Sequence, residues 1–318
     1  MNAPYVGRLA PSPTGALHLG NVRTFMIAWL RARSQGGRIV MRMEDLDHPK
    51  DKPGAALGTI EDLRWLGFDW DAEYVQSERK PRYREALERL ADRVYPCVCS
   101  RRDVESAQSA PHAGEQLFYP GTCRARFSSW REAEAFKGSS PCWRFRVPTG
   151  ETVAFEDVFA GRYEQNVAAT LGDFPVSRDE FGAGYTLAVV VDDAAMGVTE
   201  VVRGDDLLAA TPAQILLQRA LGLPTPAYCH VPLVVGPDGR RLAKRHGDTR
   251  VAAYRAAGRR PEEVIGFLAA SCGWCPAGEA VSLEDLLPAF RLETIPRLPL
   301  VVSSASIPLF QDSRQERT

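Results

Sequence analysis

Residues 4–43 are predicted to form a strand, a turn-rich loop, a helix and a second strand, and this order restricts the fold more than any other feature. Residues 4–9 are typical of a short strand, and the apolar residues of 17–34 recur at helical spacing. A Gln-Gly-Gly sequence at 35–37 ends the helix, and residues 38–43 (RIVMRM) follow as the second strand. Two strands joined through a helix in this way run parallel. The sequence therefore predicts an α/β fold with a parallel sheet.

After residue 43 the regular pattern continues to residue 94 and is then interrupted. The expected elements are helices over 53–66, 81–94 and 212–221, and strands over Tyr185–Val191, Thr199–Val202 and Val231–Val235. Residues 95–180 instead carry Cys-rich turns and a Gly/Ser/Pro-rich stretch, which indicates an insertion. The C-terminal part is predicted to be helical to about residue 290, with a Pro-punctuated tail after it. The predicted segments are 1–94, 95–184, 185–240 and 241–318.

Composition narrows the class of protein. The 318 residues carry 39 basic and 40 acidic side chains, so the net charge of −1 excludes a chain whose whole surface attracts nucleic acid. Any RNA contact must come from a local basic patch. The hydrophobic share of 45% is typical of a globular protein. Because no apolar run reaches the roughly 20 residues of a membrane span and the N-terminus lacks a secretory signal pattern, we expect a cytoplasmic protein with no membrane contact.

The loop between the first strand and its helix, Arg8-Leu-Ala-Pro-Ser-Pro-Thr-Gly15, gives the strongest functional signal. Its position directs backbone N–H groups and the positive end of the helix dipole toward a ligand. Gly15 and Gly20 allow that ligand to approach the backbone closely. His18 and Asn21 lie on one face of the first helical turn, where both side chains can donate to phosphate. For His18 taken alone, a histidine that only caps the helix is the alternative interpretation.

The whole string resembles the first signature of class I aminoacyl-tRNA synthetases, in the form found in glutamyl-tRNA synthetases. The H-I-G-H tetrad of that family stands here as His18-Leu19-Gly20-Asn21, so a neutral amide replaces the second histidine. Arg42-Met-Glu-Asp-Leu-Asp47 resembles the family's R-I-E-D-T-D at the end of the second strand, where ligands bind in open α/β sheets. The resemblance implies a Rossmann-like parallel sheet with ATP bound at His18, Gly20 and Asn21.

A second basic motif, Arg241-Leu-Ala-Lys-Arg245, follows a turn at Pro237-Asp-Gly and resembles the K-M-S-K-S signature of the same family. Arg241 keeps the charge of the first lysine, Ala243 lacks the serine hydroxyl, and Lys244 corresponds to the lysine that holds the ATP phosphates. The resemblance extends over about residues 5–250. It implies that ATP also contacts Arg241, Leu242, Ala243, Lys244 and Arg245. His18 and Lys244 are the expected catalytic residues, and Mg²⁺ arrives with ATP.

The resemblance also implies a glutamate pocket beside the first loop. The corresponding positions are Arg8, Leu9, Ala10, Pro11, Ser12, Glu44, Tyr185 and Arg203. The two carboxylates of glutamate need guanidinium partners, and its ammonium group needs a carboxylate, for which Glu44 is the candidate. A surface ion pair of Arg203 with Asp205 or Asp206, and core packing of Tyr185, are the alternatives. The implied reaction is attack of the glutamate carboxylate on the α-phosphate of ATP, with loss of pyrophosphate.

Cysteines of the insertion form a candidate metal site. Three thiolates, Cys97, Cys99 and Cys123, with one further ligand make a tetrahedral structural zinc site, and from chemistry alone His112 is the obvious fourth ligand. In the glutamyl-queuosine branch of the family, however, C-x-C…Y-x-x-x-C binds zinc. That resemblance implies the set Cys97, Cys99, Tyr119 and Cys123. Buried thiols without a metal are the alternative.

The other cysteines are assigned no metal. Cys272-Gly-Trp-Cys275 is interpreted as a pair of structural cysteines at a helix end, with a redox pair or a second part of a zinc site as alternatives. Cys142 and Cys229 have no evident partner in the sequence.

Residues 246–318 leave little room for the anticodon-binding domain of a glutamyl-tRNA synthetase, which needs about 100 residues or more. Together with the cysteine pattern, this resembles the glutamyl-Q tRNA(Asp) synthetases, which attach glutamate to the queuosine at the wobble position of tRNA(Asp). The expected substrates are ATP, L-glutamate and queuosine-containing tRNA(Asp), and the expected state is a monomer. Between Gly236 and Arg260, eight basic residues against two aspartates offer a local RNA-binding patch, with a solvated helix face as the alternative.

Three other functions are alternatives to this one. A nucleotidyltransferase that acts on a small molecule would leave Arg8, Glu44 and Arg203 without a role. Of the two that stay open, one is a truncated glutamyl-tRNA synthetase that charges tRNA(Glu). The other is a non-catalytic paralogue that binds nucleotide or RNA, which the departures at Asn21 and Ala243 favour.

Overall fold

The computed structural model describes residues 4–13, 16–46, 54–107, 117–240, 242 and 249–303, and these divide into two units. The first unit consists of Met1–Tyr74, Thr199–Asp206 and Tyr228–Thr318. The second consists of Val75–Val198 and Leu207–Ala227. The division cuts the chain differently from the four segments expected from the sequence, which stay a prediction.

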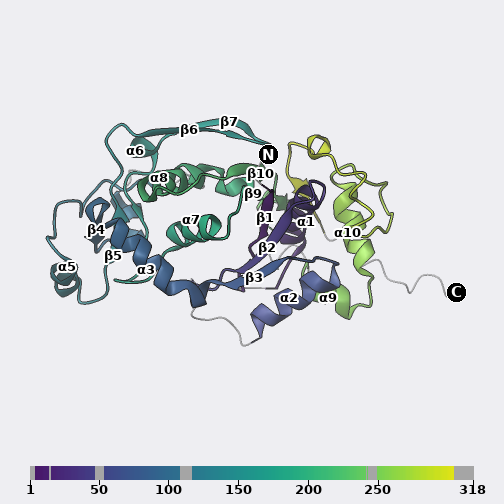
Figure 1. Ribbon diagram of the computed structural model, residues 1–318, viewed down its shortest axis with the longest axis horizontal. Helices are drawn as coiled ribbons and strands as arrows, with labels where there is room; N and C mark the ends of the chain where they lie inside the picture. The colour runs from purple at the N-terminus through teal and green to yellow at the C-terminus, as the bar shows by residue number, and fades with distance from the viewer. Residues whose placement is uncertain are drawn as a thin grey trace. The chain divides into compact units, whose positions relative to one another are not determined.

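The strand–helix–strand prediction at the N-terminus is confirmed. Strand β1 (Val6–Leu9) pairs in parallel with β2 (Arg38–Met43), and helix α1 (Leu19–Arg33) connects them (Figure 1). Ten of the fifteen residues of α1 are buried, because the helix packs on β1, β2 and β9 (Glu200–Gly204). Such a helix is apolar on more than one face.

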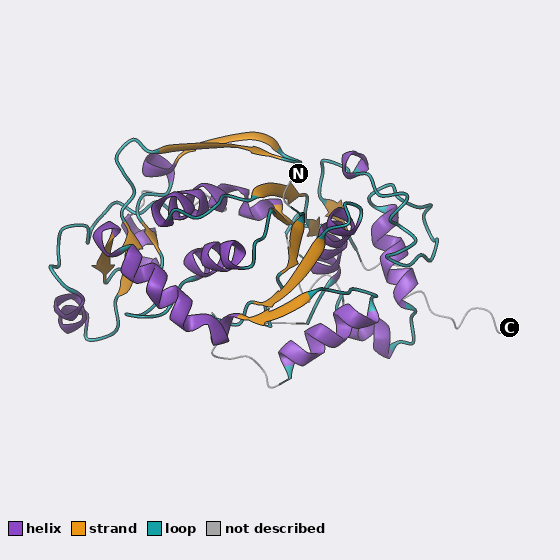
Figure 2. Cartoon of the chain, in the orientation of Figure 1, coloured by secondary structure: helices purple, strands orange, loops and turns teal. Residues whose placement is uncertain are grey.

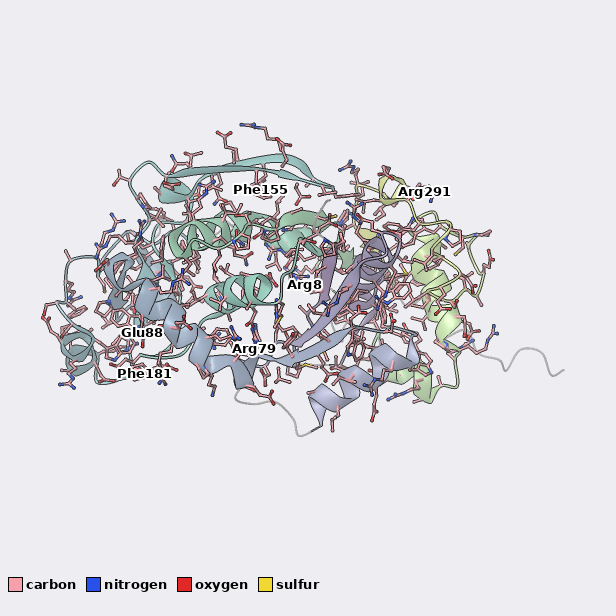
Figure 3. The ribbon with its side chains drawn as sticks, in the orientation of Figure 1. Arg8, Arg79, Glu88, Phe155, Phe181 and Arg291 are labelled. Atoms are coloured by element: carbon pink, nitrogen blue, oxygen red, sulfur yellow. The ribbon has the colours of Figure 1, made fainter. Side chains whose placement is uncertain are left out.

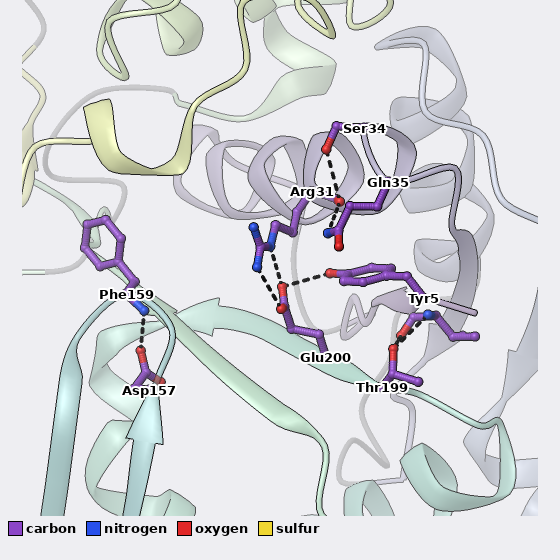
Figure 4. A network of polar contacts seen from close by, with 9 residues as sticks. Tyr5, Arg31, Ser34, Gln35, Asp157, Phe159, Thr199 and Glu200 are labelled. Carbon is purple, nitrogen blue, oxygen red and sulfur yellow. Dashed lines mark hydrogen bonds and ion pairs between the residues drawn. The ribbon is translucent and has the colours of Figure 1, made fainter. Parts of the chain in front are cut away.

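A buried polar network connects three elements of the first unit (Figure 4). The Tyr5 hydroxyl donates to Glu200 Oε1 over 2.9 Å, and Arg31 of α1 binds both oxygens of the same carboxylate over 2.8 and 3.1 Å. Burial, reinforced by the carboxylate, raises the pKa of Tyr5, so the phenol keeps the proton that it donates. Beside it, Thr199 Oγ1 accepts from the Val6 backbone over 2.9 Å. These contacts fix the start of β9 against β1 and α1.

The remaining elements of the first unit are α2, β3, β10, β11, α9, α10 and β12 (Figure 2). Their bounds are Ala55–Trp65, Ala72–Val75, Ala227–Val231, Val234–Val235, Val251–Ala256, Pro261–Ala270 and Leu300–Val301. Strand β3 lies beside β2, and β9 lies beside β10. The strand expected over Val231–Val235 is divided into the end of β10 and the short β11, and the turn at Pro237–Gly239 is confirmed by a Gly239 N–H bond to Gly236 O.

The C-terminal prediction is right only in part. Helix α10 ends at Ala270, and residues 271–299 then follow turns and one short 3-10 helix (Leu292–Thr294) rather than the helix expected to about residue 290. The Pro-rich segment also forms a strand, because β12 pairs in parallel with β11 through Val234–Leu300 and Val235–Val301.

The second unit combines two antiparallel sheets with helices. Its elements are α3 (Lys80–Arg89), β4 (Val94–Cys97), α4 (Arg101–Ala107), α5 (Trp130–Lys137), β5 (Cys142–Phe145), β6 (Thr152–Asp157), β7 (Gly161–Asn166), α6 (Val167–Thr170), β8 (Phe174–Pro175), α7 (Tyr185–Ala195) and α8 (Thr211–Leu221). Strands β4, β5 and β8 form one sheet, and β6 and β7 form a hairpin. The hairpin turn is closed by Asp157 Oδ1, which accepts from the Phe159 and Ala160 backbones (Figure 4).

The strand expected over Tyr185–Val191 is wrong, since these residues begin helix α7. The helix packs against α3 and α8, and Leu187, Ala188, Val189 and Val190 are all buried. An unbroken apolar run satisfies a buried helix as well as a buried strand. Near the end of the helix, the buried Asp192 accepts from Arg79 Nε over 2.6 Å and from Tyr83 Oη over 2.7 Å.

Among the described residues, no helix combines the length and the apolar character that crossing a membrane requires.

Candidate active site and metal centre

His18 is the N-cap of α1 and forms a capping box with Asn21. Its Nδ1 accepts from the Gly20 N–H over 3.2 Å, and Asn21 Oδ1 accepts from the His18 backbone over 3.4 Å. A neutral His18 therefore carries its proton on Nε2, and this nitrogen is the one able to donate to a phosphate. The capping role and a phosphate-binding role are thus compatible, because they use opposite nitrogens of the ring.

Gly20 leaves room for the His18 ring. A Cβ at residue 20 would lie 3.1 Å from His18 Cε1 and 3.2 Å from Nδ1. This reason for a glycine differs from the expected one, which was close approach of a ligand.

The segment that follows the second motif pairs with the start of α1. The Leu19 N–H donates to Thr249 O over 3.1 Å, the Val251 N–H donates to Leu17 O over 2.8 Å, and His18 and Arg250 form an antiparallel bridge. Of the motif itself, the buried Leu242 is described, whereas Arg241, Ala243, Lys244 and Arg245 lie outside the described residues. Residues 249–251, which follow the second motif, are therefore joined to the start of α1 within one unit.

The first loop and the end of β2 are joined directly. Arg8, 7% exposed on β1 (Figure 3), donates from Nη1 to Val202 O over 2.9 Å. The Glu44 N–H donates to Pro11 O over 2.8 Å, which fixes the strand end to the loop. Of the other predicted glutamate contacts, Leu9 and Pro11 are buried, Ala10 is half-buried and Ser12 is exposed.

Glu44 is held by Arg42, a residue that the sequence motif contained but to which no role was assigned. Arg42 is fully buried, and its Nε and Nη2 lie 3.3 and 2.9 Å from Glu44 Oε1. Residues two apart on a strand share a face, and this brings the two side chains together. A carboxylate can accept more than two hydrogen bonds, so the ion pair with Arg42 is compatible with the expected ammonium contact.

Arg203, at the end of β9, belongs to a buried polar cluster that the sequence interpretation missed. Its Nε donates to His230 Nε2 over 3.0 Å, and its guanidinium carbon lies 5.2 Å from the Tyr228 ring centroid. His230 must then be neutral with its proton on Nδ1. The alternation of Tyr228 and His230 along β10 was the signal that could have revealed them, since alternate residues of a strand share a face.

Tyr185, the eighth predicted glutamate contact, is the first residue of α7 in the second unit.

Three cysteines of the second unit gather as the sequence suggested. The sulfur atoms of Cys97, Cys99 and Cys123 all lie within 4.8 Å of one another, and Cys99 Sγ is 3.6 Å from Cys123 Sγ. A tetrahedral metal with bonds of about 2.3 Å to sulfur separates its thiolates by about 3.8 Å. The cluster therefore has dimensions that can hold a metal ion.

The Tyr119 hydroxyl completes this cluster. Its oxygen lies 3.3 Å from Cys97 Sγ and 3.8 Å from Cys99 Sγ, and it accepts from the Cys123 N–H over 2.8 Å. Its position depends on the backbone of residues 171–172, because the Tyr119 N–H donates to Leu171 O and Tyr119 bridges to Gly172. His112, the other candidate ligand, lies outside the described residues.

A buried cation faces the cluster. Arg144 Nε lies 3.1 Å from Cys97 Sγ, and its guanidinium carbon lies 3.8 Å from the Tyr119 ring centroid. A hydrogen bond from Cys142, the cross-strand neighbour of Cys97, and the charge of Arg144 lower the pKa of Cys97 to about 4, although burial opposes them. Burial and the charge on Cys97 raise the pKa of Cys99 to about 12. Cysteine binds a metal as the thiolate, so Arg144 and Cys142 favour the form of Cys97 that a metal requires.

The remaining cysteines agree with a structural role. All seven are free thiols, and Cys272 and Cys275 follow α10, where Cys275 Sγ donates to Gly266 O over 3.4 Å. Within the described ranges, the group at Cys97, Cys99 and Cys123 is the one set of three or more metal-ligating side chains.

Comparison with known proteins agrees with this geometry. Residues 5–296 match the family described as tRNA synthetases class I (E and Q), catalytic domain. The chain is 50% identical to the glutamyl-Q tRNA(Asp) synthetase of Symbiobacterium thermophilum, over 95% of this chain and 97% of that protein, and 48% identical to that of Rhodopirellula baltica, over 95% of each. A crystal structure of a glutamate tRNA ligase from Elizabethkingia meningosepticum, 26% identical, superposes with a TM-score of 0.80 over 96% of this chain and 68% of that one. The chain belongs to the class I tRNA synthetases of the E and Q type, with the α/β fold of that family.

Proposed function

We propose that this protein is an ATP-dependent ligase that activates glutamate as glutamyl-adenylate and transfers it to the queuosine of tRNA(Asp). The observation that carries the proposal is the identity of 50% and 48% to two glutamyl-Q tRNA(Asp) synthetases over nearly the full length of each.

The first step uses charge and position rather than a protein nucleophile. A carboxylate oxygen of glutamate attacks the α-phosphorus of ATP in line, and the bond to the bridging oxygen breaks as pyrophosphate leaves. His18 Nε2 and the amide of Asn21 donate to the phosphates, and Lys244 neutralises the charge that develops on them. Arg241, Leu242, Ala243 and Arg245 are the further proposed ATP contacts, with Mg²⁺ bound to the nucleotide.

The second step transfers the glutamyl group. A hydroxyl of queuosine attacks the carbonyl carbon of the adenylate, and AMP leaves with the bonding electron pair. Glu44 binds the ammonium group of glutamate, and Arg8 and Arg203 bind its carboxylates, while Leu9, Ala10, Pro11, Ser12 and Tyr185 shape the pocket. The ion pair with Arg42 holds Glu44 in position for this task.

Transfer of labelled glutamate, with ATP, onto three RNAs tests the proposed function. We expect label on queuosine-containing tRNA(Asp) and none on unmodified tRNA(Asp) or tRNA(Glu). Label on tRNA(Glu) would instead identify a glutamyl-tRNA synthetase. Label on none of the three would contradict the proposal and favour a paralogue that only binds nucleotide or RNA.

The cysteine cluster is proposed to hold one structural zinc ion through Cys97, Cys99, Cys123 and the Tyr119 oxygen. Thiolate-rich sets favour zinc over the harder divalent ions, and a zinc–oxygen bond of about 2.1 Å would separate oxygen from sulfur by about 3.6 Å. The observed distances of 3.3 and 3.8 Å from Tyr119 support this. The role is structural, since the ion would join β4 to the turn at Cys123. Tyr119→Phe and His112→Ala separate the two candidate fourth ligands, and we expect only the first to weaken zinc binding.

Gly172→Ala is expected to weaken zinc binding by about 10-fold or more, the range found when a group that orients a metal ligand is lost. A Cβ at Gly172 would lie 2.2 Å from Tyr119 O, so the backbone that carries Tyr119 must move. The measurement is competition for zinc with a chromophoric chelator. Gly161→Ala is the matched control, because Gly161 also has a positive φ, of 84°, but has no neighbour within 4 Å of the added carbon. Equal zinc affinity of the two variants would remove Tyr119 from the ligand set.

A further inference from the structure

Two phenylalanines and an arginine of the second unit form an exposed group that the proposed reaction does not use. The rings of Phe127 and Phe136 lie 5.5 Å apart between centroids, tilted by 50°. The guanidinium carbon of Arg126 lies 4.3 Å from the Phe136 centroid and 5.2 Å from that of Phe127. We name Arg126, Phe127 and Phe136 the aromatic platform.

The platform is anchored on one side and open on the other. Phe127 packs against the buried cluster that contains Cys97, Tyr119 and Cys123, so the platform rests on the candidate zinc site. Phe136, near the end of α5, is 61% exposed. The buried positions of that helix are Trp130 and Ala133, which leaves Phe136 without a share in its core. An exposed aromatic ring with a guanidinium beside it presents a plane on which a nucleic-acid base can stack.

A basic cavity begins at the next residue. Lys137 lines a cavity of about 780 Å³ together with Arg101, Arg144 and Arg178, against Asp173 as the lining carboxylate. That carboxylate already accepts from Tyr95 and from Arg124. Of the cations, Arg144 donates to Cys97 Sγ, and Arg101 forms an exposed ion pair with Glu105. The cavity wall also includes Cys99 and Tyr119 of the cysteine cluster. Phe136 of the platform is therefore followed directly in the chain by Lys137, a lining residue of this cavity.

We propose that the aromatic platform and this cavity bind unpaired nucleotides of the tRNA, with a base stacked on Phe136 or Arg126 and phosphates beside Lys137 and Arg101. The inference rests on the proposed function, which makes an RNA the partner. Single-stranded RNA requires two chemistries at once, an aromatic or guanidinium plane for the base and cations for the backbone. An acidic peptide would use the cations but not the exposed ring. The juxtaposition of both chemistries on α5 therefore favours RNA.

Direct binding of queuosine-containing tRNA(Asp) to the full chain, measured by filter retention at several salt concentrations, tests the proposal. Phe136→Ala is expected to weaken binding about 10-fold, the effect of losing one stacked base, and Phe136→Tyr to retain it. Lys137→Ala is expected to reduce the slope of log affinity against log salt by about 0.7, as one lost phosphate contact on a single strand does. In glutamate transfer, Phe136→Ala should raise KM for the tRNA while kcat and KM for ATP stay unchanged.

Phe181→Ala is the matched control. Phe181 is also exposed, at 52%, in the second unit (Figure 3), with the Arg84 guanidinium carbon 4.9 Å from its ring centroid. Unchanged binding by Phe136→Ala, or an equal loss in Phe181→Ala, would overturn the proposal. Competition by poly-L-glutamate as strong as by RNA would also overturn it, since the site would then be a general polyanion surface.

The outcome for the proposed function is separate. If the wild-type chain binds tRNA through Phe136 but labels tRNA(Glu), the platform stands and the queuosine assignment fails. If the wild type labels queuosine-containing tRNA(Asp) and Phe136→Ala binds it equally well, the assignment stands and the platform fails. If the wild type binds none of the three RNAs, the platform is rejected.

Discussion

Lys244→Ala is expected to reduce glutamyl-adenylate formation about 100-fold or more. The lysine corresponds to the phosphate-binding lysine of the second signature, and its charge is most valuable when negative charge develops on the departing pyrophosphate. Loss of one such transition-state contact typically costs a factor of 10²–10³. Because the contact strengthens in the transition state, we expect the loss mainly in kcat, with a smaller change in KM for ATP. ATP–pyrophosphate exchange in the presence of glutamate, and of tRNA(Asp) where exchange requires it, measures this step.

Lys80→Ala provides the control for a lost lysine charge. Lys80 is exposed at the start of α3 in the second unit. The Lys80→Ala variant should catalyse ATP–pyrophosphate exchange at the wild-type rate. Exchange by Lys244→Ala at that same rate would show that residues 241–245 are not the second signature, despite the pairing of residues 249–251 with the start of α1.

Cys99→Ser is expected to release the zinc ion and to destabilise the fold around it. A serine hydroxyl is a far weaker ligand than a thiolate, and structural zinc contributes directly to folding free energy. Purified wild-type protein should contain about one zinc per chain and the variant almost none. The midpoint of thermal unfolding should fall by about 5 °C or more. Metal analysis after gel filtration and calorimetry give the two values.

Cys275→Ser separates loss of a ligand from loss of any cysteine. Cys275 is half-buried in the first unit and donates to Gly266 O, a bond that a serine can also make. The Cys275→Ser variant should retain its zinc ion. Full retention of metal by Cys99→Ser would remove Cys99 from the ligand set.

Local sequence predicted the parts of the fold that local interactions determine. The periodicity of α1, the strands on either side of it and the turn at residues 237–239 all form as expected. The run at Tyr185–Val191 failed, because burial on all sides makes a helix and a strand equally apolar. The strand at Leu300–Val301 was missed for a different reason, since its partner β11 is more than 60 residues earlier and two-residue strands carry no period.

In the candidate site too, the sequence predicted some residues and missed the residues that position them. Motifs located His18, Glu44 and the three cysteines, because the chemistry of these residues shows in the sequence itself. The partners that orient them come from elsewhere in the chain, as Arg144 does for Cys97 and Gly172 does for Tyr119. His230 beside Arg203 shows the same limit, since only the pairing of β9 with β10 brings them together.

The division into units has a consequence for biosynthesis. Because the second unit is complete in sequence at Ala227, its last residue is synthesised before the remaining 91 residues of the chain, all of which belong to the first unit. In the first unit, β1 and β2 are synthesised long before β9 and β10. Strand β11 cannot pair with β12 until Val301 has been added. The edges of β1 and β2 therefore stay unpaired while the middle of the chain is synthesised. We expect nascent chains of this enzyme to depend on chaperones at that stage.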